Sequence, residues 1–284
     1  MAFNTEHQPK QAAALLAGSG RVSIYNTTGG AVTQQFAQHN LTLIPPIPSG
    51  SIIHDNCCGA GTVSRLLLSS PQAPADLELH ATDTDQIFLD ALQQDVTSNG
   101  WPVHVSNQRA EKLSFPENSF THSITNIGIF FTTGAGLDGA REVYRTPKPG
   151  GIAVVNCWEA LAWLTPFKQT HQILRPDIPY PTPRILWNDG TQLQRVMSGA
   201  GFLPENTRVS RSVAWARTRN VRDWAEKSWA FLGGLGGWRR GSDEARWDEA
   251  VGLMVKFMLE QPGTEVRGEE VWMKGSQWIV VATK

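Results

Sequence analysis

Residues 51–69 read SIIHDNCCGAGTVSRLLLS and combine three local patterns. Residues 51–55 contain the apolar pair Ile52 and Ile53 and have the length of a short buried strand. Gly59 and Gly61 follow, and a glycine backbone can pass close to a ligand because it has no Cβ atom. Thr62 then starts a helical pattern, as an N-cap residue does. The free N–H groups at a helix start attract a negative or electron-rich group, so this stretch predicts a nucleotide-like ligand on the loop.

Strand-like and helical segments continue to alternate after this stretch. The strand-like segments are 77–82, 103–107, 123–127 and 152–157, and the helical ones are 84–99 and 138–144. The segment 152–157 (IAVVNC) is almost wholly apolar, as is typical of strands covered on both faces, and PKPGG at 147–151 predicts a tight turn before it. The alternation predicts an α/β fold with a parallel sheet and helices on both of its faces.

The sequence changes character near residue 158, because ten of the eleven tryptophans lie at or beyond Trp158. Helical patterns cover 158–174, 189–201, 220–232 and 242–260, and strand-like ones cover 209–215 and 272–283. We expect a single domain over 1–284. Its expected parts are an N-terminal helical cap (1–48), a cofactor-binding core (49–158) and substrate-side helices with the last strands (159–284).

The overall composition narrows the classes of partner. The chain has 284 residues with 25 basic and 26 acidic side chains, a formal net charge of −1, and this balance argues against a nucleic-acid partner. Three cysteines without CxxC spacing argue against a zinc site or a disulfide framework, so we expect no metal. The chain lacks a signal-peptide pattern and an 18-residue apolar run, so we expect a cytoplasmic protein with no membrane partner.

Two acidic residues refine the nature of the ligand. Asp83 lies 24 residues after Gly59, at the end of the next predicted strand, where a carboxylate meets a ribose diol in Rossmann-type crevices. Asp55 lies four residues before Gly59. It would crowd a pyrophosphate but suits a cationic ammonium group. The string at 59–64 (GAGTVS) nevertheless comes close to the dinucleotide fingerprint, so an NAD(P)-dependent oxidoreductase stays open.

Four segments resemble class I S-adenosylmethionine-dependent methyltransferases. Residues 55–61 (DNCCGAG) resemble their DxACGxG first motif, and 81–85 (ATDTD) resemble the acidic second motif. Residues 109–120 (RAEKLSFPENSF) are similar to the DAExLPFxDxSF stretch of the ubiquinone-biosynthesis type, and 142–151 (EVYRTPKPGG) resemble the ExxRVLKPGG turn. The motifs stand in the family order. The C-terminal part is weakly similar to fungal secondary-metabolite enzymes such as the gliotoxin-type thiol methyltransferases.

The resemblance implies a Rossmann-like, seven-stranded, mostly parallel sheet with a helical substrate-covering lid. It implies S-adenosyl-L-methionine as cofactor and S-adenosyl-L-homocysteine as product. The implied cofactor-binding residues are Tyr25, Asp55, Asn56, Cys57, Gly59, Gly61, Asp83, Thr84, Ala110, Glu111, Asn126 and Ile127.

Three departures from the family pattern affect this expectation. Cys57 replaces a glycine or alanine. Arg109 stands where an aspartate usually lies near the adenine amino group, so Glu111 and the backbone of Ala110 would have to contact adenine. Residues 126–130 (NIGIF) lack the acidic or aromatic residues of amino-methylating enzymes, which leaves the acceptor atom open.

The sequence gives weaker signals for the residues that bind the methyl acceptor. Candidate substrate-binding residues are Phe130, Phe131, Trp158 and Trp163. His171 is a weak candidate for a general base, with an ordinary surface histidine as the competing interpretation. The catalytic residues therefore stay unknown, and the acceptor atom can be sulfur, oxygen or nitrogen.

The sequence predicts methyl transfer to a small aromatic or apolar natural product, in fungal secondary metabolism, by a monomer or homodimer. Two other functions stay open. The first is a catalytically divergent methyltransferase-like protein that binds a ligand or catalyses a cyclisation. The second is the NAD(P)-dependent oxidoreductase.

Overall fold

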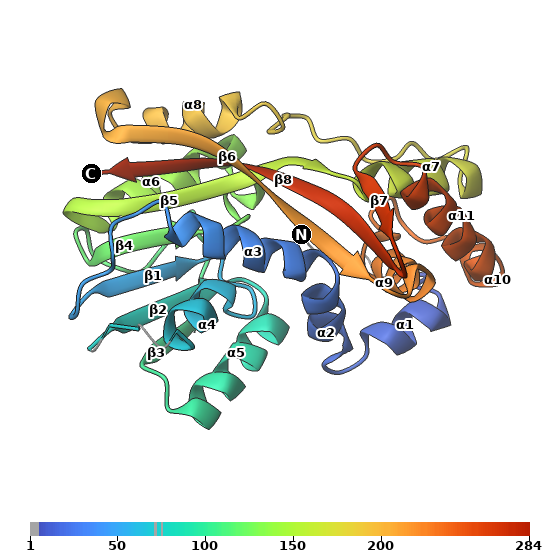
Figure 1. Ribbon diagram of the computed structural model, residues 1–284, viewed down its shortest axis with the longest axis horizontal. Helices are drawn as coiled ribbons and strands as arrows, with labels where there is room; N and C mark the ends of the chain where they lie inside the picture. Colours follow the sequence, from blue (N-terminus) through green and yellow to red (C-terminus); the bar gives the residue numbers. More distant parts are fainter. Residues whose placement is uncertain (1–5, 71–72, 75) are drawn as a thin grey trace. The chain divides into compact units, whose positions relative to one another are not determined.

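The computed structural model describes residues 6–70, 73–74 and 76–284 of the chain (Figure 1). Within this part, eight strands form one sheet in the order β3-β2-β1-β4-β5-β8-β6, with β7 paired to β8. The strands are β1 (Ile52–Asn56), β2 (Glu78–Asp83), β3 (Val103–Asn107), β4 (Phe120–Thr125), β5 (Pro147–Leu161), β6 (Thr207–Thr218), β7 (Thr264–Arg267) and β8 (Glu270–Thr283). The predicted α/β, Rossmann-like fold is confirmed. The predicted count of seven strands is wrong, because the short antiparallel β7 adds an eighth.

The chain divides into two compact units. We call the first the helical unit; it contains the described part of 1–32, together with 160–184 and 213–276. The second, the sheet unit, contains 33–159, 185–212 and 277–284. The division into cap, core and substrate side stays a prediction, and residues 1–5 of the expected cap lie outside the described part.

The helices are distributed over both units. The helical unit contains α1 (Lys10–Leu16), α2 (Gly20–Thr27), α7 (Leu164–Leu174), α9 (Val221–Leu232), α10 (Ser242–Ala245) and α11 (Trp247–Leu259). The sheet unit contains α4 (Thr62–Leu68), α5 (Gln86–Asn99), α6 (Leu137–Arg145) and α8 (Thr191–Ala200), with the single turns η1 (Ile129–Phe131), η2 (Gly134–Gly136) and η3 (Pro204–Asn206). Helix α3 (Gly29–Leu41) starts in the helical unit and continues into the sheet unit. Among the described residues, no helix is long and apolar enough to cross a membrane.

Alternating side chains along the central strands separate two apolar cores in the sheet unit. Val154 of β5 packs in one core with residues of α4 and α5, whereas its neighbours Ala153 and Val155 pack in the other with residues of α6 and α8. This period of two is what a strand requires when helices cover both faces of its sheet (Figure 1).

Strands β1, β2, β3, β4 and β5 pair in parallel. Asn56, the last residue of β1, is in register with Thr82 of β2 and Thr125 of β4. The loops that follow β1, β2 and β4 therefore leave the sheet at one edge, which is where ligands bind in parallel α/β sheets.

Two local predictions are wrong. Residues 158–161 were expected to begin a helix but continue β5, and α7 starts only at Leu164. An apolar run without a clear period can form a helix or a strand. Here the run continues as a strand because β5 lies between β4 and β8 in the sheet. The expected turn at 147–151 belongs to β5 with a shifted register, because Gly150 donates its N–H to the carbonyl of Lys284.

Candidate functional site

The glycine loop after β1 is tight and has left-handed backbone at Cys57 (φ 54°), Gly59 (φ 53°) and Gly61 (φ 82°). The N–H of Cys58 donates to the carbonyl of Thr82 at 2.9 Å, and this bond fixes the loop to β2. A Cβ on Gly61 would lie 2.4 Å from Cδ1 of Leu92, whereas one on Gly59 would meet no atom within 4 Å. Gly61 is therefore needed for packing, and Gly59 faces open space.

Asp83 at the end of β2 meets this loop. Its Oδ2 accepts the N–H of Gly59 at 2.9 Å, and its Oδ1 accepts the N–H of Asp85 at 2.9 Å. A carboxylate has about four acceptor positions, so two remain for a ligand. The side chain is half-buried. The structure thus brings the predicted Gly59 and Asp83 together and leaves acceptor capacity for a diol.

Asp55 has a structural partner that the sequence interpretation missed. Its Oδ2 accepts both the N–H (3.0 Å) and the hydroxyl (2.7 Å) of Ser64. Burial raises the pKa of the Asp55 carboxyl to about 6, against the effect of these bonds. Asp55 therefore caps the first turn of α4 from the strand end. The serine within the first helical turn was the signal that could have revealed the pair.

The loop after β4 contacts the loop after β1. Ile127 has φ 59°, and its N–H donates to Oδ1 of Asn156 at 2.8 Å. A Cβ on Gly128 would lie 2.4 Å from Cβ of Cys57. Cys57 and Ile127 are non-glycine residues in a left-handed conformation, which costs on the order of 1–3 kcal/mol each. Strain of this kind gathers at ligand sites, and here two strained residues lie on two adjoining loops.

A buried chain of side-chain amides supports the second loop. It was not found from the sequence. Asn156 Nδ2 donates to Oδ1 of Asn126 at 2.9 Å and to Oε1 of Gln277, and Gln277 Nε2 donates to Oδ1 of Asn40 at 2.9 Å. Asn126 itself donates to the carbonyl of Thr33 at 3.0 Å. Because the partners of Asn126 in this network come from α3, β5 and β8, the network fixes the loop against three elements. Residues so far apart in the sequence give no local signal.

Other predicted cofactor residues are bound to protein partners. Asn56 is fully buried and donates to Oγ1 of Thr125 at 3.0 Å, so its side chain joins β1 to β4. Glu111 accepts from the guanidinium of Arg109 through Oε1. Arg109, which replaces the usual aspartate, therefore binds the Glu111 carboxylate that was expected to contact adenine. Ala110 is buried beside this pair, and Thr84 is exposed.

The two loop cysteines are not nucleophiles. Burial, with the charges of Asp83 and Asp55 as smaller causes, raises the pKa of the Cys57 and Cys58 thiols far above the usual range. A thiol needs its ionised form to react. Both side chains are therefore neutral packing groups at neutral pH.

Three of the four predicted acceptor residues lie in the sheet unit. The rings of Phe130 and Phe131 in η1 are 4.3 Å apart, and Phe131 is 53% exposed. Trp158 lies within β5, with its ring 5.5 Å from that of Phe36. The other residue, Trp163, is buried in the helical unit. An aromatic surface thus follows β4 in the sheet unit.

Trp163 and Tyr25 belong to the helical unit. Trp163 is 4% exposed, and its ring packs edge-on against Trp224 at 5.6 Å. The ring of Tyr25 lies 6.2 Å from that of Phe231. Both contacts are packing contacts within the helical unit. A role of either residue at the cofactor or acceptor stays a prediction.

Both ring nitrogens of His171 are engaged by other protein groups, so His171 cannot act as a general base in this arrangement. Its Nε2 lies 2.9 Å from the carbonyl of Ile178, and its Nδ1 lies 3.0 Å from Nη1 of Arg175. A guanidinium can only donate, so Nδ1 accepts and Nε2 carries the proton. Burial lowers the pKa of His171. The ring is neutral without a free lone pair, and at 1% exposure the surface interpretation is wrong as well.

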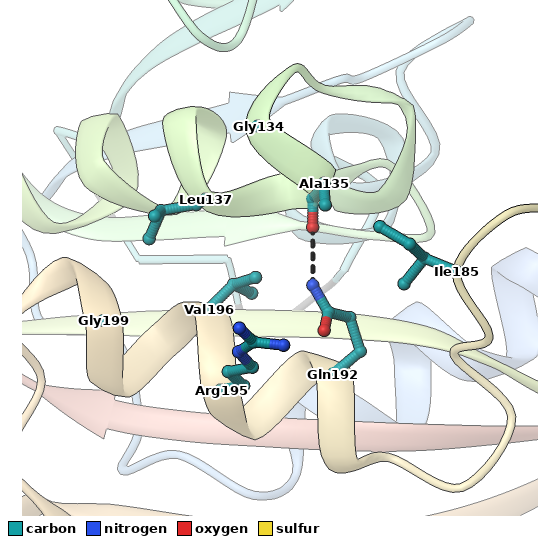
Figure 2. A pocket seen from close by; sticks show the side chains of 8 residues that line it. All are labelled: Gly134, Ala135, Leu137, Ile185, Gln192, Arg195, Val196 and Gly199. Atoms are coloured by element: carbon teal, nitrogen blue, oxygen red, sulfur yellow. Dashed lines mark hydrogen bonds between the residues drawn. The ribbon is translucent and has the colours of Figure 1, made fainter.

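A pocket of about 380 Å³ lies in the sheet unit between η2, α6 and α8 (Figure 2). Its lining residues are Gly134, Ala135, Leu137, Ile185, Gln192, Arg195, Val196 and Gly199. Gln192 Nε2 donates to the carbonyl of Ala135 at 2.8 Å across one end. The volume is at the lower end of the roughly 300–1,000 Å³ of small-molecule sites. The wall is mostly apolar, and Arg195 is the charged residue in it.

Comparisons with known proteins agree with this geometry. Residues 53–151 match a family model described as a methyltransferase domain. A comparison with curated proteins gave no match. The matched segment runs from β1 into β5 and includes the glycine loop, Asp83 and the loop after β4.

Three solved structures illustrate the similarity of fold. The [4+2]-cyclase SpnF has a TM-score of 0.53 at 17% identity, with 88% of this chain and 81% of that chain covered. The YcgJ protein of Bacillus subtilis has 0.53 at 15%, with 87% and 99% covered. Phosphoethanolamine N-methyltransferase 2 of Haemonchus contortus, solved with phosphomonomethylethanolamine and S-adenosylhomocysteine, has 0.55 at 13%, with 95% and 58% covered.

Identities this low show the fold alone. The family match adds that the resemblance is concentrated on the segment that carries the candidate site. The chain therefore has the Rossmann-like fold of class I methyltransferases, and its residues 53–151 match the model of a methyltransferase domain.

Proposed function

We propose that the chain binds S-adenosyl-L-methionine at the edge formed by the loops after β1, β2 and β4, and transfers its methyl group to a small molecule. The observation that carries the proposal is the bond from Gly59 to Asp83 beside the open space at Gly59. The match of 53–151 to a methyltransferase domain supports it. Two neighbours of similar fold were solved with S-adenosylhomocysteine or S-adenosyl-L-methionine.

The residues of the site fit the proposed cofactor. The free acceptor positions of Asp83 suit the two hydroxyls of a ribose, and Gly59 leaves room for the chain that connects ribose to sulfur. Helix α4 starts at Thr62 directly after the glycine loop, and the N–H groups of a helix start attract an electron-rich group such as the methionine carboxylate. The N–H of Ser64 is already taken by Asp55. When bound, the sulfonium supplies an activated methyl group, and S-adenosyl-L-homocysteine is the product.

The protein then has to orient the acceptor and exclude water, which can supply on the order of 7–11 kcal/mol. The exposed ring of Phe131 and the partly buried ring of its neighbour Phe130 favour an aromatic or apolar acceptor. The expected base, His171, has both nitrogens engaged. An acceptor that ionises easily or needs no base, such as a thiol, an acidic hydroxyl or an amine, therefore fits best.

The finer assignment follows the same proposal. We place the acceptor among natural products, in fungal secondary metabolism, and the protein in the cytoplasm as a monomer or homodimer. Neither nucleic acid nor membrane is proposed as a partner, because the chain has 25 basic against 26 acidic residues.

The test is ligand identification followed by turnover. Mass spectrometry of the small molecules that copurify with the protein is expected to find S-adenosyl-L-methionine or S-adenosyl-L-homocysteine. Radiolabelled methyl transfer to a panel of thiols, phenols and amines is then expected to label one chemical class. Saturable binding of NAD(P) without binding of the methyl donor would overturn the proposal and favour the oxidoreductase.

A second function has its own support. His171 does not offer a free base, and a neighbour of similar fold is the [4+2]-cyclase SpnF. A protein that binds the cofactor but catalyses a cyclisation, or only binds a ligand, shares every feature of the cofactor site. Bound cofactor with no label transferred to any acceptor class would favour this second function.

A further inference from the structure

Three potential metal ligands meet on strands β2 and β3 of the sheet unit. Glu78 and His80 alternate along β2, so their side chains lie on the same face. His104 of β3 is the register partner of His80. Nε2 of His80 lies 2.8 Å from Oε1 of Glu78, and the two imidazole rings stack at 4.9 Å. One ligand atom from each residue lies within 4.8 Å of the other two.

We propose that Glu78, His80 and His104 form a binding site for a divalent transition-metal ion such as Zn²⁺, with water completing its coordination. Two imidazoles and one carboxylate are the donor set that zinc takes in open sites. Ligands about 2.1 Å from an ion are at most roughly 4.2 Å apart, so a small side-chain rotation closes the observed spacing. Mg²⁺ and Ca²⁺ are disfavoured, because they prefer oxygen donors.

The donor atoms of the cluster are accessible to an ion from solvent. Glu78 and His104 are exposed, and His80 is partly exposed with 21% of its side chain open. Among the described residues, Glu78 pairs with His80 but no ion pair is formed by His104.

Aromatic rings form the floor of the cluster. The rings of Phe115 and Phe120 lie 5.2 Å and 5.5 Å from that of His80 and hold it in place. The fully buried ring of His54 stacks on Phe120 at 4.8 Å.

The proposed metal site is separate from the cofactor site. Glu78 is the first residue of β2 and Asp83 is the last. His80 precedes Asp83 by three residues, or roughly 10 Å of extended strand. Because β3 is an edge strand, an ion held by His80 and His104 would clamp it to β2. This role is independent of methyl transfer.

The test uses the full, untagged chain with ZnCl₂ and CoCl₂ as probes. Isothermal titration is expected to show one saturable Zn²⁺ site per chain, and Co²⁺ is expected to give the visible absorption of an N/O-bound ion. His104→Gln and His80→Gln should each weaken Zn²⁺ binding by about tenfold or more. His7→Gln is the matched control. Nε2 of His7 lies 3.6 Å from Oε1 of Glu6, so this histidine also has a carboxylate neighbour. Among the described residues, however, His7 belongs to no group of three possible metal ligands.

Zn²⁺ binding that is unchanged in both cluster variants, or absent from the wild type, would overturn the proposal. Circular dichroism checks that the variants fold. His104 is exposed on an edge strand, so we expect His104→Gln to disturb the fold less than His80→Gln. Binding of S-adenosyl-L-methionine by His104→Gln is expected to equal that of the wild type, so failure of one proposal is distinguishable from failure of the other.

Discussion

Gly59 donates its backbone N–H to Oδ2 of Asp83 across 2.9 Å, although 24 residues separate them in the sequence. The bond joins the loop after β1 to the last residue of β2. The N–H of Asp85 holds the other carboxylate oxygen, so the Asp83 side chain has one fixed orientation. A ligand that spans Gly59 and Asp83 therefore meets a preformed site, which lowers the entropy lost on binding.

The contact between Cys57 and Gly128 predicts an energetic coupling between the two loops. A Cβ on Gly128 would lie 2.4 Å from Cβ of Cys57. Gly128→Ala should therefore lower the free energy of unfolding by about 1–3 kcal/mol, as overpacking does. In a Cys57→Gly background the clash is gone, so the same change should cost at least about 1 kcal/mol less. Urea unfolding of the wild type, both single variants and the double variant measures this difference.

Gly252 provides the control for that cycle. It lies in α11, where a Cβ would meet no atom within 4 Å. Gly252→Ala should be neutral or stabilise by up to about 1 kcal/mol, because alanine favours a helix. An equal effect of Gly128→Ala with and without Cys57 would show that the two loops do not meet in this way.

The buried Asp55 predicts a pH dependence of stability. Burial raises its pKa to about 6 in the folded state, above the ordinary value of 3.8. A raised carboxyl pKa stabilises the fold below the unfolded pKa, and this contribution is lost as the pH rises through the folded value. Relative to Asp55→Asn, the wild type should lose about 2 kcal/mol of unfolding free energy between pH 4 and pH 7. Urea unfolding of both proteins across this range measures it, and a constant gap would refute the shift.

Arg175 and Asp243 form a buried ion pair in the helical unit. Arg175 is 0% exposed and Asp243 is 3% exposed, with Nη2 of the arginine 2.8 Å from Oδ2. Asp243→Ala leaves the guanidinium buried without its counter-charge, so we expect a loss of about 3–5 kcal/mol. The matched control is Asp248→Ala, which removes the exposed partner of Arg222 and should change stability little. Thermal unfolding of the two variants compares them, and similar shifts would contradict the assignment.

The meeting of the glycine loop with Asp83 was predictable from the sequence because its signals are local. Residues 51–55, the glycine loop and Asp83 lie on one strand–loop–helix–strand unit, and the spacing of Gly59 and Asp83 placed them at the same sheet edge. Parallel pairing then brings the end of β4 beside them.

The misses have physical reasons. β7 is polar and only four residues long, so no apolar alternation marks it. The environment of His171 depends on Arg175 and on a carbonyl seven residues away, and helical spacing says nothing about such burial. The amide network joins Asn40 to Gln277, which are 237 residues apart in the sequence. Local sequence patterns cannot predict a contact over that separation.

The most direct measurement is isothermal titration of S-adenosyl-L-methionine into the wild type and Asp83→Ala. Asp90→Ala serves as control, because Asp90 is an exposed carboxylate on α5 that accepts a hydrogen bond from Gln86 on its own helix. We expect saturable binding by the wild type and by Asp90→Ala, and none by Asp83→Ala. A loss of affinity below about threefold in Asp83→Ala, roughly 0.6 kcal/mol, would contradict the proposed cofactor site.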